Sequence, residues 1–229
     1  MTTTSGNGLT PSLRTFNESL LSSSTPFTAE ESSITRAAYA ALLAGTPISL
    51  ADLARRANLS VGAVERVLAG RPGVARFSAD GQLEGYLGLS RRPTAHAFVV
   101  QHRTLFVWCV WDGLFLPRVI GRTARLTSRC PVTGHPIALF VGPDGVLDVD
   151  PGSAVMSFVA SSGPAGNGAG ACCRYIHFLE SPVAGKQWQA GHPTGCVLTI
   201  DQAWSLARSF VDTKLLASDA VELAVVSRP

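Results

Sequence analysis

The sequence contains no apolar run of the roughly 18 residues that a membrane-spanning helix needs, so we expect no membrane partner. Its first residues lack a basic stretch followed by an apolar one, and we expect no secretory signal. Charge is also scarce: 19 Lys and Arg oppose 16 Asp and Glu, and the net charge of +3 is too small to predict a nucleic-acid partner. With 229 residues, 46% of them apolar, the composition instead favours a compact protein with a substantial core.

The cysteines form no recognisable disulfide framework. They are Cys109, Cys130, Cys172, Cys173 and Cys196, an odd number at irregular spacing. Such usage is typical of the reducing cytosol, where thiols remain free to bind metal or to react. We therefore expect a cytoplasmic protein.

The first 27 residues are rich in Ser, Thr and Gly, and we expect most of them to form a mobile arm. The spacing of Leu and Phe over residues 12–21 also permits a short helix there. A clear helix start follows, because Thr28 and Glu31 have the spacing of a capping box. We therefore place the first boundary between residues 27 and 28.

Residues 28–92 have the pattern of a winged helix-turn-helix domain. Helices are predicted from Thr28, from Ser49 and over residues 61–68, and a hairpin with a turn at residues 80–81 follows them. Such domains often bind DNA through the last helix, but here that helix carries only one Glu and one Arg. The alternative interpretation is that the fold serves as a packing module.

Residues 93–229 predict an α+β domain with a mixed or antiparallel sheet and flanking helices. Strands are expected over residues 95–100, 104–107, 122–128, 137–141, 146–149, 155–160, 172–179 and 197–200, and helices over the Cys109 segment, residues 181–190 and, capped by Asp201, residues 201–216. The glycine-rich residues 161–170 are expected to form a flexible loop or lid.

The most informative stretch is the apolar segment Val107–Pro117, which holds one thiol and one carboxylate. If the segment is helical, Cys109 and Asp112 share a face, since they stand three residues apart. Burial raises the pKa of a carboxyl group, so Asp112 would be able to hold and donate a proton near neutral pH. The alternative is a core cysteine beside an aspartate that caps the helix or faces water.

Two other kinds of site have weaker support in the sequence. Zinc requires about four Cys or His ligands, and Cys130 with His135 is the only close pair. A Cys-His-Asp nucleophile would combine Cys109 with His135 or His177, but no signature of such an enzyme surrounds Cys109.

The adjacent pair Cys172 and Cys173 is less common than a lone cysteine. In a strand, neighbouring side chains point to opposite faces, so only one of the two would share a site with Cys109. Two thiolates that converge from separate elements suit a soft ion of low coordination number.

Several motifs together resemble the organomercurial (alkylmercury) lyase family over about residues 30–217. They are Trp108-Cys109-Val110-Trp111-Asp112, Phe115-Leu116-Pro117, Ile120-Gly121-Arg122-Thr123-Ala124, Ser128-Arg129-Cys130, and Cys172-Cys173 followed by Ile176-His177-Phe178. The sequence departs from the family pattern in its longer N-terminal arm, in Cys196, and in Arg174, where some members have histidine.

The resemblance implies protonolysis of R–Hg–X to R–H and Hg(II). It makes Cys109 and Cys172 the mercury ligands, and Asp112 the group that moves the proton and then helps to hold Hg(II). It makes Cys130 structural, and Cys173 the neighbour on the other face. It further implies that no organic cofactor is needed, that external thiols carry the product away, and that mercuric reductase accepts it.

The alternative function is a mercury- or metal-sensing transcription regulator with a DNA-binding winged helix. Its cysteines would sense the metal. A pure sensor has no use for a proton donor, so Asp112 is the residue that separates the two hypotheses. We expect no specific DNA binding, because the third helix of residues 28–92 offers few groups to bases or phosphates.

Overall fold

Side-chain caps fix where the first helices begin. The computed structural model describes residues 14, 17–18, 21–22, 25–159 and 173–216. In it the predicted capping box of Thr28 and Glu31 is present, and Ser49 with Asp52 forms a second one. The helices that these boxes begin end at Gly45 and Asn58, both in the left-handed conformation that closes a helix.

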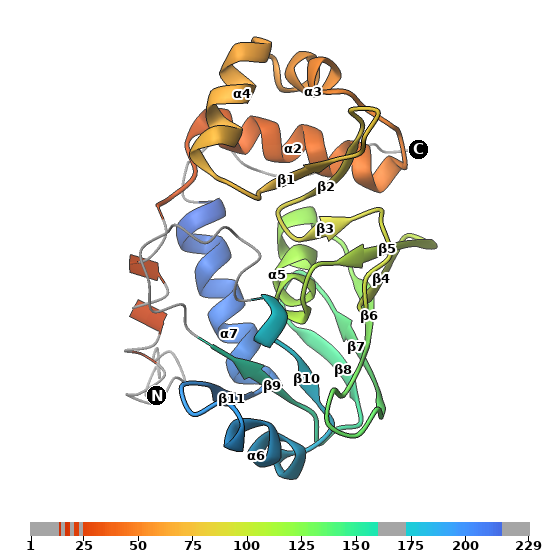
Figure 1. The fold of residues 1–229 in the computed structure, drawn as a ribbon, viewed down its shortest axis with the longest axis vertical. Coiled ribbons are helices and arrows are strands. Elements are labelled where there is room, and N and C mark those ends of the chain that lie inside the picture. The colour runs from red at the N-terminus through yellow and green to blue at the C-terminus, as the bar shows by residue number, and fades with distance from the viewer. Residues whose placement is uncertain (1–13, 15–16, 19–20, 23–24, 160–172, 217–229) are drawn as a thin grey trace, which may run out of the picture.

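The protein has the predicted α+β architecture, with the first helices and the first two strands at one end and the later strands and helices at the other (Figure 1). Its helices are α2 (Ala29–Ala44), α3 (Leu50–Ala57), α4 (Val61–Gly70), α5 (Val110–Ile120), η1 (Cys173–Tyr175), α6 (Pro182–Ala190), α7 (Ile200–Phe210) and the π-helical η2 (Val211–Leu215). Its strands are β1 (Ala75–Phe77), β2 (Leu83–Tyr86), β3 (Leu89–Ser90), β4 (Ala97–Val100), β5 (Arg103–Val107), β6 (Ala124–Arg129), β7 (Pro136–Val141), β8 (Val146–Asp150), β9 (Val155–Phe158), β10 (Phe178–Leu179) and β11 (Cys196–Thr199).

One antiparallel sheet connects the N-terminal helices to the rest of the protein. It has eight strands in the order β1-β2-β3-β5-β4-β6-β7-β8, so the predicted hairpin β1–β2 continues into the strands that follow it. A second antiparallel sheet has the order β10-β9-β11. The division into domains at residue 92 remains a prediction, and the two parts share the larger sheet.

Two predicted elements differ from the structure. The strand expected over residues 172–179 is wrong for residues 173–175, which form the 3₁₀ turn η1, and only Phe178–Leu179 pair as a strand. The last helix is capped by Thr199 instead of Asp201, because the Thr199 hydroxyl accepts from the backbone N–H of Gln202. The lid expected over residues 161–170 lies outside the described residues, as does most of the helix expected over residues 12–21.

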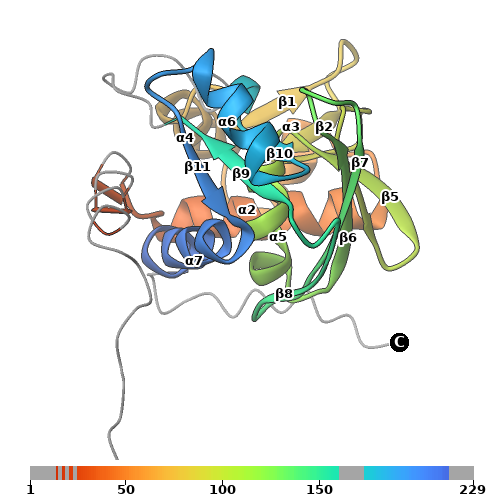
Figure 2. The same cartoon turned by 90° about the horizontal axis from the view of Figure 1, so that it is seen from below.

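Helix α5 lies between the large sheet and α7 (Figures 1 and 2). All of its residues except Arg118 are buried. Gly113 faces the sheet so closely that a Cβ there would lie 2.3 Å from a methyl carbon of Leu126. On the other side the Trp111 ring packs edge-on to Phe158 of β9, at 5.1 Å between centroids, and to Phe210 of α7, at 6.5 Å. The start of α5 is therefore held from two sides, and this start carries the predicted site.

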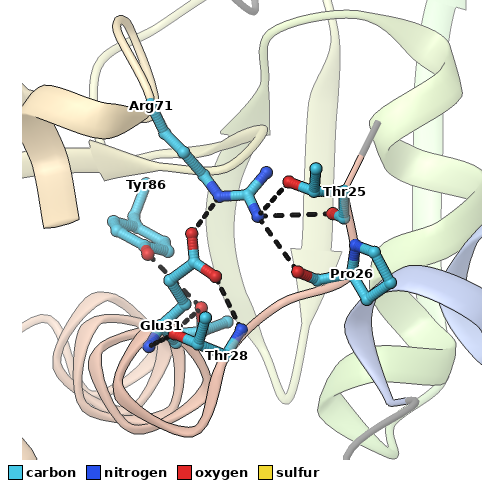
Figure 3. Close-up of polar contacts among 7 residues, drawn as sticks. Thr25, Pro26, Thr28, Glu31, Arg71 and Tyr86 are labelled. Atoms are coloured by element: carbon cyan, nitrogen blue, oxygen red, sulfur yellow. Dashed lines mark hydrogen bonds and ion pairs between the residues drawn. The ribbon is translucent and has the colours of Figure 1, made fainter. Parts of the chain in front are cut away.

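Arg71 fastens the chain that precedes α2 to the N-terminal helices (Figure 3). Its guanidinium pairs with Glu31 and donates to the carbonyl oxygens of Thr25 and Pro26 at 3.3 and 3.4 Å. It also covers the Phe27 ring at 4.2 Å. Thus the last three residues of the predicted arm are bound to the fold, whereas most of residues 1–24 lie outside the described part.

Candidate functional site

The site begins where β5 passes into α5. Cys109 is the extended N-cap residue of this helix, and Asp112 occupies its third helical position. The Asp112 carboxylate turns back and accepts a hydrogen bond from the Cys109 backbone N–H at 2.9 Å. The two side chains therefore meet as predicted, although Cys109 precedes the helix instead of lying within it.

Cys173 completes a group of three. One ligand atom from each of Cys109, Asp112 and Cys173 lies within 4.8 Å of the others, and the described residues form no other such group of three or more Cys, His, Asp or Glu side chains. Cys109 and Asp112 are 1% and 8% exposed, and Cys173 is half-buried. Two thiols and a carboxylate in this setting suit a soft metal ion.

The cysteine pair differs from its prediction in one respect. Cys173 was expected to face away from Cys109, on the assumption that the pair lies in a strand. The chain forms the 3₁₀ turn η1 there, in which neighbouring side chains do not alternate between two faces. Cys172 lies outside the described residues, so its role remains a prediction.

Burial controls the protonation of the group. It raises the pKa of Asp112 to about 6, although hydrogen bonds from Cys109 and the positive charge of Arg76 act in the opposite direction. Burial also raises the pKa of the Cys109 thiol; a hydrogen bond with Cys173 opposes this, and the Asp112 charge adds to it. A thiol that retains its proton thus lies beside a carboxylate that titrates near neutral pH, which allows a proton to pass between them.

The turn between β2 and β3 forms one wall of the site. Its Gly88 has a φ of +87°, and a Cβ there would lie 2.5 Å from the Asp112 carboxyl carbon. The Gly88 carbonyl accepts from the Trp108 backbone N–H at 2.9 Å, and the Tyr39 hydroxyl donates to the Leu87 carbonyl at 2.8 Å. The N-terminal part of the chain therefore supports the carboxylate from behind.

The sequence reveals only part of this wall. A glycine after Leu87 is a visible turn signal. Its approach to Asp112, however, depends on the pairing of β3 with β5, which no local pattern reveals.

The other candidate residues lie apart from the group. Cys130 is buried in a turn, where its backbone N–H donates to the His135 carbonyl at 2.9 Å. The His135 imidazole instead lies 3.5 Å from Glu180, and the His177 ring contacts the Arg174 carbonyl at 2.8 Å. In the described part of the chain, the predicted alternatives of a zinc site and a Cys-His-Asp nucleophile therefore do not form.

Comparisons with known proteins agree on one family. The family model described as alkylmercury lyase matches residues 89–212. An alkylmercury lyase of Streptomyces lividans is 36% identical over 174 residues, which cover 76% of this chain and 80% of that protein. One of Staphylococcus epidermidis is 37% identical over 167 residues, which cover 73% of this chain and 76% of that protein.

A solved structure has the same fold. It is the mercury-bound form of MerB2, and it superposes with a TM-score of 0.67 at 27% identity over 88% of this chain and 98% of that one.

Proposed function

The chain belongs to the alkylmercury lyase family, and from this membership and its site we propose that it cleaves the carbon–mercury bond of organomercurials by protonolysis. The products are a hydrocarbon and Hg(II). The observation that carries the proposal is the group of Cys109, Asp112 and Cys173, in which a buried carboxyl group that can take up and release a proton near neutral pH lies beside two thiols. Membership supplies the reaction, and the site supplies the groups that perform it.

The first step is ligand exchange at mercury. The Cys109 sulfur binds the metal of R–Hg–X, X leaves, and the thiol proton passes to the Asp112 carboxylate. Without this proton acceptor the buried thiol would remain protonated, because burial raises its pKa. A second thiol then binds the same mercury as its thiolate, its proton leaving with X, and this second sulfur ligand increases the electron density on the carbon bound to mercury.

The second step breaks the carbon–mercury bond. Asp112 delivers its proton to the carbon, the electron pair of the bond forms the new C–H bond, and R–H leaves. Hg(II) remains bound to the two thiolates, and the Asp112 carboxylate is free to act as a third ligand. A carboxyl group with a pKa of about 6 is suited to both halves of this proton transfer.

We assign the second thiolate to Cys172, on the resemblance of its motif. Cys173 is the rival for this role, because its sulfur belongs to the group around Cys109. The remaining parts of the proposal concern turnover: external thiols remove Hg(II), mercuric reductase accepts it, no organic cofactor takes part, and the reaction occurs in the cytoplasm. No helix among the described residues is long and apolar enough to cross a membrane.

Release of benzene from phenylmercury in excess thiol, measured by gas chromatography, tests the function. Wild type should release benzene in many turnovers. Asp112→Asn should still bind phenylmercury but release benzene at least about 10²-fold more slowly, because an amide cannot carry the proton. Benzene release by Asp112→Asn at the wild-type rate would remove this residue from the mechanism, and its absence in wild type would refute the function.

The regulator hypothesis is not favoured. Helix α4 corresponds to the predicted recognition helix, and Glu65 and Arg66 are its charged residues. A regulator would also have no need for a buried carboxyl group beside its thiols. A gel shift at about 150 mM salt should show no sequence preference; tight binding to one DNA site, released by mercury, would support the regulator instead.

A further inference from the structure

The hairpin β1–β2 holds the residue that precedes the catalytic thiol. Arg76 and Gly85 are register partners in this hairpin, and the Trp108 indole lies over them. The Arg76 guanidinium carbon is 4.2 Å from the indole centroid, and a Cβ on Gly85 would lie 3.3 Å from the Trp108 ring nitrogen. That nitrogen is buried and has no hydrogen-bond partner among the described residues, so ring packing and the cation–π contact with Arg76 hold the indole there.

The indole in turn fixes the Arg76 guanidinium beside the site. Arg76 is exposed to solvent, yet its charge acts on the buried Asp112 carboxylate. A positive charge that influences Asp112 also lies within electrostatic range of a substrate whose carbon receives the Asp112 proton.

Arg76 has no ion-pair partner among the described residues. Other arginines of the protein pair with carboxylates, as Arg71 does with Glu31, Arg92 with Glu84, and Arg118 with Asp212. A guanidinium stacked on an indole presents its N–H donors in a fixed plane, the geometry that carboxylates accept best. Arg76 thus combines a position fixed on the neighbour of Cys109, unused donors and a charge that acts on Asp112.

We propose that Arg76 is a specificity residue that favours substrates carrying a carboxylate, held by its guanidinium while mercury is bound by the thiols. The inference rests on the proposed function. The carboxylate can belong to the organic group of the substrate or to the small thiol that delivers the mercury. Both sources present the same chemistry to Arg76, and a crossed set of substrates separates them.

The experiment compares kcat/KM for phenylmercury and 4-carboxyphenylmercury, each delivered as its 2-mercaptoethanol adduct and as its 3-mercaptopropionate adduct. Arg76→Gln removes the charge, Arg76→Lys retains it without the planar fork, and Arg56→Gln is the matched control. Arg56 is exposed on α3, which lies on the side of α2 away from α5 (Figure 1). Its loss changes the net charge equally but not the charge beside Trp108.

In Arg76→Gln the preference for carboxylated over neutral substrate should fall by about two- to five-fold, the range of an exposed ion pair. Arg76→Lys should retain only part of the preference, because it keeps the charge without the planar fork, and Arg56→Gln should retain all of it. About 0.5 M salt should weaken the preference in wild type. If the preference falls only for 4-carboxyphenylmercury, Arg76 binds a carboxylate on the organic group. If it falls only for the 3-mercaptopropionate adducts, Arg76 binds a carboxylate on the delivering thiol. Either result supports the inference.

The inference would be overturned if Arg76→Gln had the same preference ratio as wild type. It would also be overturned if Arg56→Gln lowered this ratio as much as Arg76→Gln does. In both cases continued benzene release from neutral phenylmercury would leave the proposed function intact. Failure of wild type to cleave any of the four substrates would instead refute the proposed function itself.

Discussion

At the scale of single residues, Asp112 makes the stability of the protein depend on pH. Its pKa is about 6 in the fold against an ordinary value of 3.8, so the fold favours the protonated form. The stabilisation from this preference is fully present below about pH 3.8 and is lost as pH rises through about 6. The Asp112 charge should therefore lower the free energy of unfolding at pH 8, whereas at pH 4 the group is protonated in the fold and has no such effect.

Asp112→Asn should raise the free energy of unfolding at pH 8 by up to about 3 kcal/mol, the energy equivalent of this pKa difference. The amide oxygen can still accept from the Cys109 N–H, and at pH 4 the two proteins should differ little. Urea unfolding at both pH values measures the difference. Asp148→Asn, at an exposed position of β8, is the control and should show no such dependence; equal effects of Asp112→Asn at pH 4 and pH 8 would contradict the prediction.

The choice between the two neighbouring thiols is also made at this scale. Cys172→Ser should abolish benzene release, because a hydroxyl is a poor ligand for a soft ion, whereas Cys173→Ser should retain much of it. Cys109→Ser serves as the inactive reference. The reverse order, with Cys173→Ser inactive and Cys172→Ser active, would assign the second mercury ligand to the residue whose sulfur lies in the group with Cys109 and Asp112.

At the scale of elements, the turn between β2 and β3 should be as sensitive as the thiols. Gly88→Ala introduces a Cβ against the Asp112 carboxyl carbon and should cost about 1–3 kcal/mol of stability, as overpacking does, together with most of the turnover. Gly81→Ala is the matched control, since Gly81 also has a positive φ but nothing within 4 Å of its added Cβ. It should lose some stability and keep its turnover; equal activity of the two variants would show that the wall does not position Asp112.

The elements also show how far the sequence could predict this protein. The capping box at Thr28 and the helix start at Ser49 depend on neighbouring residues, so the sequence revealed them, and the meeting of Cys109 with Asp112 is equally local. The turn η1 is not predicted, because a composition rich in β-forming residues does not distinguish a strand from a turn whose conformation is set by contacts with the rest of the fold. The approach of Gly88 to Asp112 depends on strand pairing, and such contacts between distant residues lie beyond any local pattern.

At the scale of the whole molecule, the N-terminal residues up to 90 are expected to support the site without taking part in the reaction. Deletion of residues 1–90 would remove β1, β2 and β3, which would leave the edge of β5 unpaired and Asp112 without its wall. This truncation should aggregate on size-exclusion chromatography and lose turnover. Deletion of residues 1–24 alone, which spares the Arg71 contacts of Thr25 and Pro26, should retain both solubility and activity. Full activity of the longer truncation would show that the site needs only residues 91–229.

The hydrogen bond from the Phe27 N–H to the Lys214 carbonyl, at 2.8 Å, joins two residues near opposite ends of the described chain. The two ends of the segment from residue 27 to residue 214 therefore lie side by side, so that the segment forms a nearly closed ring. A ring can be opened elsewhere if the original gap is bridged, and the exposed turn at Asp80–Gly81 is a suitable place for new termini. A circular permutant cut there, with a short linker from Lys214 to Phe27, would begin its translation with the strand β2 and make the thiols before the helices α2, α3 and α4.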